Sequence, residues 1–265
     1  ANTTGSSNTA IGYGALDANT TASNNTAVGA DSLTANTTGT KNTGIGYEAL
    51  EATTTGSYNT TVGSNSLKAN TTGVSNNALG QSALASNTTG SNNVAIGLDA
   101  LATQQTANDN TAVGYFALKA NTTASRNVGV GNSSLGAATT GGENTAVGEQ
   151  AGQHITTGTL NTLVGSISGD ALTVGITNVA YGYGSLTSDT AGNRSTAIGY
   201  NTLQNQNFSS STDTYNTAVG FQAGINVTTG IQNTLIGGLA GDALTDADYN
   251  VAIGKGALSA DTQGS

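Results

Sequence analysis

Titratable side chains are the residues most able to do chemistry, and in this chain they are few and scattered. His154 is the only histidine of the 265 residues. An enzyme active site needs several titratable groups that converge in one pocket, and this histidine has no obvious partner in the sequence. We therefore expect His154 to be a surface histidine, and the sequence predicts no catalytic residue and no enzyme.

The carboxylates could hold a cation only if several of them stood together. They are scattered along the chain as Asp109, Glu143, Asp170, Asp242, Asp246 and Asp248. The last three are close in sequence, but they lack the Gly-Gly-x-Gly-x-Asp pattern of calcium-binding β-rolls. We expect solvated carboxylates with no metal and no cofactor, and a weak cation site at these three aspartates is the alternative.

Aromatic residues are the remaining groups that could recognise a ligand. They recur at one point of a repeated motif, which Phe221 continues: Tyr13, Tyr47, Tyr115, Tyr183 and Tyr200. Tyrosine rings can stack on sugars or pack against a corner of the chain. We favour the packing role, and these five tyrosines together with Phe208 are the candidate surface contacts.

A short repeat with a constant period organises the chain. Its signature is Asn-Thr-Ala-Val/Ile-Gly, and the first residue of each signature is position zero of a coil. Successive coils begin 17 positions apart, as Asn8 and Asn25 do, and the single exception is the step of 21 positions from Ser195 to Asn216. The coils begin at Asn8, Asn25, Asn42, Asn59, Asn76, Asn93, Asn110, Asn127, Asn144, Asn161, Asn178, Ser195, Asn216, Asn233 and Asn250.

Two columns of like residues run through the coils. Position four is glycine in all fifteen coils, beginning with Gly12, Gly29, Gly46, Gly63, Gly80, Gly97 and Gly114. A column without exception indicates a backbone conformation that rejects a Cβ atom. Position zero is nearly always asparagine, beginning with Asn8, Asn25 and Asn42. We expect these asparagines to form an internal ladder in which each amide bonds the next.

The period predicts an all-β fold. A repeat of two helices needs about 30 residues or more, whereas the period of this chain is near the size of one β-solenoid turn. In Thr-Ala-Val-Gly, β-branched and small residues alternate, so Val or Ile should lie on one side of a strand and the small residues on the other. The sequence predicts a parallel β-roll or β-solenoid of about fifteen coils.

The rest of each coil should contain a second strand and a turn. A short extended stretch is expected around Ala-Leu, as at Ala15-Leu16 and Ala49-Leu50. The chain should then reverse at Asn-Thr-Thr-Gly, where the asparagine bonds its own backbone and the glycine supplies a positive φ.

The chain divides into two arrays. Residues 1–143 are regular, whereas residues 144–265 form a variant array in which 144–186 resembles 216–258. In these two stretches glycine replaces the usual leucine of position eight, at Gly152, Gly169, Gly224 and Gly241. The extra residues of the long step lie near 204–215 and should protrude. Protruding loops often carry contacts, but a tolerated insertion is the favoured interpretation.

Composition excludes several classes of protein. Charged residues are 8% of the chain, against about 25% in typical soluble domains, and the net charge is −9. Such a chain would repel a phosphate backbone, so we expect no nucleic-acid partner. No apolar run approaches about 20 residues, so we expect no membrane insertion. Cysteine is absent, which excludes disulfides and thiolate metal sites.

The aliphatic content of each coil is small. It is mainly Val or Ile at position three and Leu at position eight. At roughly 25 cal/mol per Å² of buried apolar area, so thin a core barely offsets the entropy of ordering a coil. Joining several copies lengthwise would bury a second apolar face, so we expect an obligate parallel homo-oligomer.

The motif resembles known repeats. Asn/Ser-x-Ala-Val/Ile-Gly followed by a glycine-containing turn resembles the head repeats of trimeric autotransporter adhesins. The longer phrase Asn-Thr-Ala-Val-Gly-x-x-Ala-Leu-x-x-Asn-Thr-Thr-Gly resembles repeat arrays of tail-fibre proteins from marine and other environmental bacteriophages. The resemblance covers nearly the whole chain. The adhesin repeats are a few residues shorter, so the Asn-Thr-Thr-Gly corner is expected to be an enlarged outer loop.

This resemblance implies an assembly and a role. The implied fold is left-handed, and the implied assembly is an intertwined or side-by-side homotrimer. The implied function is a structural fibre segment of a viral tail fibre or surface adhesin, at an extracellular or virion-surface location. Such a segment reaches or attaches to a host cell surface, where a glycan or a protein is the partner.

Two other functions fit parts of the sequence. Threonine columns at positions one, twelve and thirteen could form the hydroxyl array of an ice-binding solenoid, although four valines interrupt the first column: Val94, Val128, Val179 and Val251. A polysaccharide-cleaving tailspike needs paired acids in a groove. No coil presents such a pair, although acids from different chains could meet at an interface.

Overall fold

The computed structural model describes residues 2–262, which contain strands and turns and no helix. Each signature forms one three-residue strand at positions one to three, and the result is a parallel β-solenoid of about 14 turns. The predicted fold class is confirmed to that extent. The chain forms two compact units, Ala1–Asn127 and Val128–Ser265. The predicted division at residues 143 and 144 rests on sequence similarity and stays a prediction.

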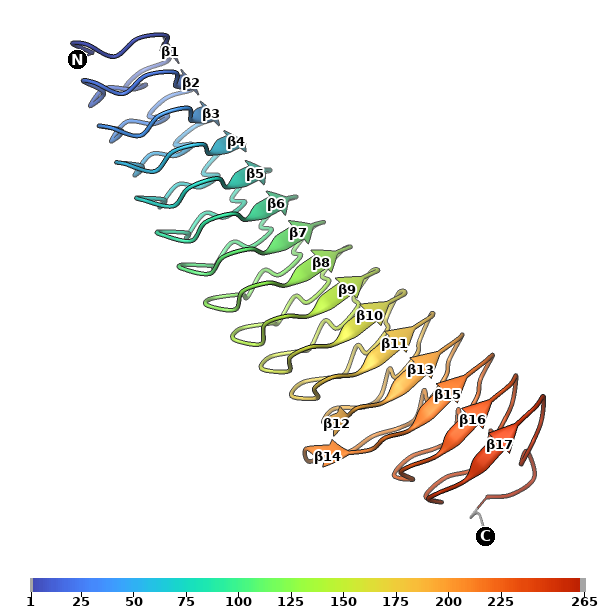
Figure 1. Cartoon of the computed structure of the whole chain (residues 1–265). Coiled ribbons are helices and arrows are strands. Elements are labelled where there is room, and N and C mark those ends of the chain that lie inside the picture. Colours follow the sequence, from blue (N-terminus) through green and yellow to red (C-terminus); the bar gives the residue numbers. More distant parts are fainter. Residues whose placement is uncertain (1, 263–265) are drawn as a thin grey trace. The chain divides into compact units, whose positions relative to one another are not determined.

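The strands of the first unit form one parallel sheet. Each strand pairs with the next, and every residue lies opposite its equivalent one period later, as Thr9 lies opposite Thr26. Figure 1 shows these strands following one another along the coils. They are β1 (Thr9–Ile11), β2 (Thr26–Val28), β3 (Thr43–Ile45), β4 (Thr60–Val62), β5 (Asn77–Leu79), β6 (Val94–Ile96) and β7 (Thr111–Val113).

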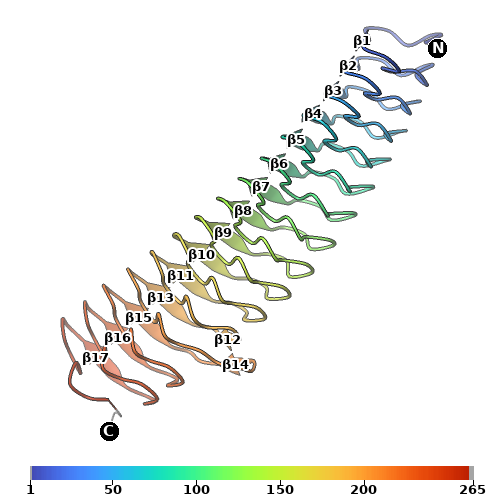
Figure 2. The ribbon, with the colours of Figure 1, turned by 180° about the vertical axis from the view of Figure 1, so that it is seen from behind.

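The second unit repeats this arrangement and adds a small sheet. Its main parallel sheet consists of β8 (Val128–Val130), β9 (Thr145–Val147), β10 (Thr162–Val164), β11 (Val179–Tyr181), β13 (Thr196–Ile198), β15 (Thr217–Val219), β16 (Thr234–Ile236) and β17 (Val251–Ile253). Thr196 lies opposite Thr217, so the long step leaves the main sheet in register. β12 (Gly192–Asn193) and β14 (Thr212–Asp213) pair separately, away from the main sheet (Figure 2).

The interior of each coil is narrow and takes only some of the aliphatic side chains. Alanine at position two and leucine at position eight point inward, and Leu33, Leu50 and Leu67 are fully buried. Val or Ile at position three points outward and stays partly exposed, as at Ile45 and Val62. The predicted alternation along the strand is confirmed, and the leucine column alone supplies large apolar side chains to the regular coils.

Asparagine side chains connect the coils from within, as the ladder prediction required. Asn42 donates its backbone N–H to Oδ1 of Asn25 at 2.9 Å, and Asn59 does the same to Asn42 at 3.0 Å. The Asn25 Nδ2 donates to the carbonyl of Gly39 at 2.9 Å. These amides are buried. They therefore satisfy backbone groups of neighbouring coils that the short strands leave without partners.

The glycine column at position four has the backbone conformation that the sequence predicted. Its φ is 136° at Gly29 and 141° at Gly46. A Cβ added to Gly29 would lie 2.3 Å from the carbonyl oxygen of Gly46. Both the dihedral angle and the close approach of the next coil therefore exclude a side chain at this corner.

The glycine of the Asn-Thr-Thr-Gly turn has a different cause from the predicted one. Gly39 does not have a positive φ; the positive φ falls two residues later, at Lys41. A Cβ on Gly39 would instead lie 2.2 Å from the carbonyl oxygen of Gly56. The prediction of a positive φ was wrong because close stacking, not turn geometry, requires this glycine. The Asn36 Nδ2 does donate to the Gly39 carbonyl at 3.0 Å, as predicted.

The predicted second strand around Ala-Leu is also wrong. Leu33 and Leu50 have φ values of 52° and 56°, in the left-handed region, and the segment is a series of turns. A left-handed residue costs roughly 1–2 kcal/mol. Burying a leucine side chain gains about 1.5–3 kcal/mol, which offsets that cost. Burial of the leucine therefore decides the conformation, against its local preference.

The variant coils of the second unit have a rearranged core. A Cβ on Gly152 would lie 2.7 Å from Cδ1 of Leu163, and one on Gly169 would lie 2.8 Å from its Cδ2. One leucine from position two thus fills the space of two position-eight leucines. The asparagine of position eleven is replaced by buried Ile155 and Leu172. The duplicated stretch repeats this exchange around Leu235, Gly224 and Gly241.

This exchange predicts strong coupling between Leu163 and Gly152. Leu163→Ala should lower the free energy of unfolding by about 2–5 kcal/mol because it opens a cavity. Gly152→Leu alone should also destabilise, since its side chain would collide with Leu163. The double variant should be more stable than the sum of the single effects predicts, as measured by denaturant unfolding in a double-mutant cycle. Additive effects would contradict the proposed core exchange.

Candidate interaction surfaces

The outward side chains of positions one and three form an exposed, uncharged surface in each unit, here called the sheet face. No charged residue occupies positions one to three of any coil. In the first unit Ile45, Leu79 and Ile96 remain 38% to 49% exposed, although like side chains lie above and below them. In the second unit Val147 and Ile236 are similarly exposed. A continuous column of exposed apolar side chains is typical of a protein interaction site.

The predicted tyrosines at position five all lie at the surface. Tyr13 is the most exposed, and the others are about half exposed. In the first unit Tyr115 stacks on its chain neighbour Phe116 with ring centroids 3.7 Å apart. In the second unit Tyr183 and Tyr200 stack on each other, and Phe221 continues the stack. Their role as ligand contacts stays a prediction.

The prediction that Phe208 is a surface contact is wrong. Phe208 is only 8% exposed, and its backbone N–H donates to Oδ1 of Asp189 at 3.2 Å. The long step gives the loop enough chain to turn this ring inward, where burial of its apolar area is favourable. The longest exposed run of the insertion is Ser209–Ser211.

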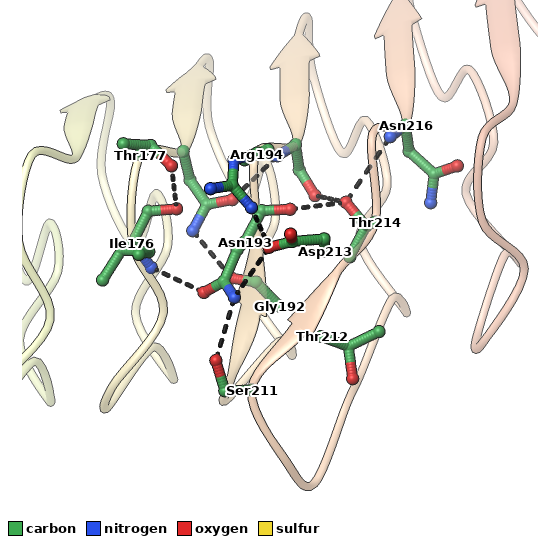
Figure 3. A network of polar contacts seen from close by, with 12 residues as sticks. Ile176, Thr177, Gly192, Asn193, Arg194, Ser211, Thr212, Asp213, Thr214 and Asn216 are labelled. Atoms are coloured by element: carbon green, nitrogen blue, oxygen red, sulfur yellow. Dashed lines mark hydrogen bonds and ion pairs between the residues drawn. The ribbon is translucent and has the colours of Figure 1, made fainter.

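The insertion is tied to the preceding coil by a network of polar contacts (Figure 3). Asn193 Nδ2 donates to Oγ of Ser211 at 3.0 Å and to Oδ1 of Asp213 at 3.3 Å. Arg194 forms an ion pair with Asp213 and lies over the Tyr215 ring at 5.6 Å. Because these groups satisfy one another, the network fixes the loop and does not resemble an open binding site.

Asp189 is a buried carboxylate that sequence reasoning missed. It occupies position eleven, where regular coils carry asparagine, and it accepts hydrogen bonds from Gln206 Nε2 at 2.6 Å and Gly192 N at 2.9 Å. Burial raises the pKa of Asp189, although these hydrogen bonds and those from Phe208 and Ala191 act in the opposite direction. The sequence could have revealed this carboxylate, because an acidic residue stands at a position where other coils carry an amide.

Cation–π pairs between neighbouring coils were also missed. Lys41 Nζ lies 4.9 Å from the centre of the Tyr58 ring. The two residues are one period apart, so the repeat places both at position sixteen. Such contacts on an exposed column contribute about 0.5–1 kcal/mol. The signal was a basic and an aromatic residue at the same position of successive coils.

His154 is exposed, as predicted, and pairs with the next coil. Its Nδ1 lies 3.0 Å from the carbonyl oxygen and 3.3 Å from Oδ1 of Asp170. Partial burial raises the pKa of Asp170, while the neighbouring His154 lowers it. A single histidine and one carboxylate at the surface provide no nucleophile and no paired acids.

The structure does not support the alternative cation site at Asp242, Asp246 and Asp248, or the use of the position-twelve threonines as an ice-binding array. Across residues 2–262, no group of three or more acidic, histidine or cysteine side chains is placed to hold a metal ion. Asp248 Oδ1 instead accepts from the backbone N–H of Ile231 at 2.7 Å. The threonine hydroxyls of position twelve donate to carbonyls of the next coil, as Thr37 does to Thr54 at 3.1 Å. These hydroxyls connect coils and do not form a free array.

Comparison with known proteins adds no assignment. No protein-family model, curated protein or solved structure matches the chain. In the part of the chain that the structure describes, no helix is long and apolar enough to cross a membrane.

The buried Asp189 predicts a pH-dependent stability. Its folded pKa is raised above the ordinary value of about 3.9. The fold therefore favours the protonated carboxyl, and this contribution is present below the ordinary pKa and lost as pH rises through the folded pKa. Asp189→Asn should remove this decline from the free energy of unfolding measured between acidic and neutral pH. The exposed control Asp246→Asn should leave the decline unchanged, and equal pH profiles for all three proteins would refute the assignment.

Proposed function

We propose that the chain is a structural segment of a fibre, either a viral tail fibre or a surface adhesin, that extends to or attaches to a host cell surface. The observation that most directly supports this proposal is the sheet face. It runs along the strands of each unit, presents Thr, Val and Ile, and contains no charge. Flat, apolar and uncharged surfaces favour association with an identical surface, because no charge must be desolvated.

The proposed assembly is a parallel homotrimer in which the sheet faces meet around a common axis. The narrow interior supports this assembly, because one leucine column per regular coil buries little apolar area. Burying the position-three column between copies would supply the missing area. The number three and a left-handed coil are taken from the resemblance to adhesin head repeats. Neither follows from the contacts within one copy.

The proposed surroundings are extracellular, at a cell or virion surface. The cysteine-free composition, with only 8% charged residues, suits a rigid element that does not depend on disulfides or metals. A polysaccharide-cleaving tailspike would need two carboxylates facing one groove. The carboxylates lie on the turns and corners, not on the sheet face where copies would meet. A non-enzymatic role is therefore the stronger proposal.

Ice binding is the competing use of the same surface. The threonines of position one lie on the sheet face in register with the valine and isoleucine column. An ice-binding protein must leave this face open to water, whereas the proposed fibre covers it. Thermal hysteresis at millimolar protein separates the two functions, and the fibre proposal predicts none.

The assembly is tested by substituting the sheet face. Ile45→Asp with Ile96→Asp should prevent trimer formation, because each copy would bury two unpaired carboxylates. The matched control, Thr55→Asp with Thr106→Asp, places the same charges on exposed turns of the same coils. Sedimentation equilibrium should give a trimer for the unmodified chain and the control. It should give a dissociated or unfolded chain for the sheet-face variant.

Two outcomes would refute the proposed assembly. One is an unmodified chain that is folded, by circular dichroism, and monomeric at micromolar concentration. The other is a sheet-face variant that sediments as the unmodified chain does.

A further inference from the structure

The side chains at position five of the second unit differ in size and charge from coil to coil. After Asn132 they are, in coil order, Glu149, Ser166, Tyr183, Tyr200, Phe221, Gly238 and Lys255. Three aromatic residues thus lie between two small residues, and the flanking coils carry opposite charges. The insertion near 204–215 leaves this series intact, because β13 and β15 remain in register.

The three rings form one continuous stack. The centroids of Tyr183 and Tyr200 are 5.4 Å apart at an interplanar angle of 13°. Those of Tyr200 and Phe221 are 5.5 Å apart at 8°. Faces inside the stack are occupied by neighbouring rings. The outer faces of Tyr183 and Phe221 are therefore the ones a ligand could cover.

Gly238 leaves the outer face of Phe221 open. Apart from its chain neighbours Gly237 and Leu239, a Cβ added to Gly238 would meet a single atom within 4 Å, the carbonyl oxygen of Phe221 at 3.9 Å. Its φ is not positive, unlike that of its neighbour Gly237. Neither packing nor backbone conformation therefore requires glycine at this position. The Phe221 and Lys255 levels are two coil steps apart, about 9–10 Å, and the level between them, here called the slot, carries no side chain at position five.

The far side of the slot carries a positive charge. Lys255 is exposed and forms no ion pair with any residue in the range 2–262. The other end of the stack differs, because Ser166 adds a side chain next to Tyr183 and Glu149 supplies a negative charge. Only the Gly238 end combines an open ring face, a vacant level and a cation.

We propose that this slot binds a single acidic pyranose at the end of a glycan. The apolar C–H face of the sugar stacks on Phe221, as rings stack on aromatic platforms, and its carboxylate pairs with Lys255. The net charge of −9 repels a uniformly acidic polymer, so one acidic ring on a neutral glycan suits the site better. The ligand class is a terminal sialic or uronic acid.

This inference deepens the proposed attachment function, since it names the ligand of a host-contacting fibre. It does not depend on the sheet face, because position five lies beyond the glycine corner that ends each strand. Assembly and glycan binding can therefore be measured separately on the same protein.

NMR titration of the full chain tests the site with 3′-sialyllactose and a glucuronate-terminated trisaccharide. At least one should bind, and lactose should bind at least about tenfold more weakly. Phe221→Ala and Gly238→Tyr should each weaken binding by about tenfold, the first by removing the platform and the second by filling the slot. Lys255→Gln should weaken binding of the acidic sugar and leave binding of lactose unchanged. Added NaCl should have the same effect on both ligands, because it screens the ion pair.

The matched control is Ser166→Tyr, which lengthens the stack at its other end and should leave binding unchanged. Circular dichroism establishes that each variant is folded. The inference is overturned if neither acidic sugar binds, or if Gly238→Tyr binds as the unmodified chain does. A trimer that binds neither sugar refutes the site alone, and a folded monomer that binds one refutes the proposed assembly alone.

Discussion

The stacking of like residues from successive coils is the constraint on which the rest of the structure depends. Each strand of the main sheets is very short, too short to hold a sheet together by itself. The asparagine ladder supplies additional hydrogen bonds inside the coil, and the glycine column permits the close approach at the corner. A residue one position out of register would place an amide against an apolar side chain. The strict period follows from this requirement.

The same constraint makes the interior positions interdependent, whereas the exterior positions vary more freely. Interior changes occur as compensating sets, since Leu163 fills the space beside Gly152 and Gly169. Exterior positions need only tolerate their neighbours in the column. The uncharged sheet face, the stacked rings of the second unit and the ion pairs of the turns therefore all occur at exterior positions. The long step is accommodated because its extra residues lie in a turn, away from the main sheet.

Periodicity made the fold class, the strand positions, the asparagine ladder and the glycine column predictable from sequence. Conformations that arise from contacts between coils were not predictable. Leu50 is left-handed because of burial, and Gly39 is required by the carbonyl of the next coil. Among candidate surface residues, the exposed tyrosines were found by their common position. Phe208 lies in the one segment outside the repeat, where the pattern gave no information on its burial.

Deletion of whole and partial repeats tests the stacking most directly. Removing residues 63–79 joins Val62 to Gly80 and deletes one complete period, whereas removing 63–78 leaves one extra residue in the strand. The account predicts that the first variant keeps the strand-type circular dichroism and a cooperative thermal transition. The second should lose the cooperative transition, because its coils cannot align on both sides of the joint. Equal behaviour of the two variants would contradict in-register stacking as the basis of the fold.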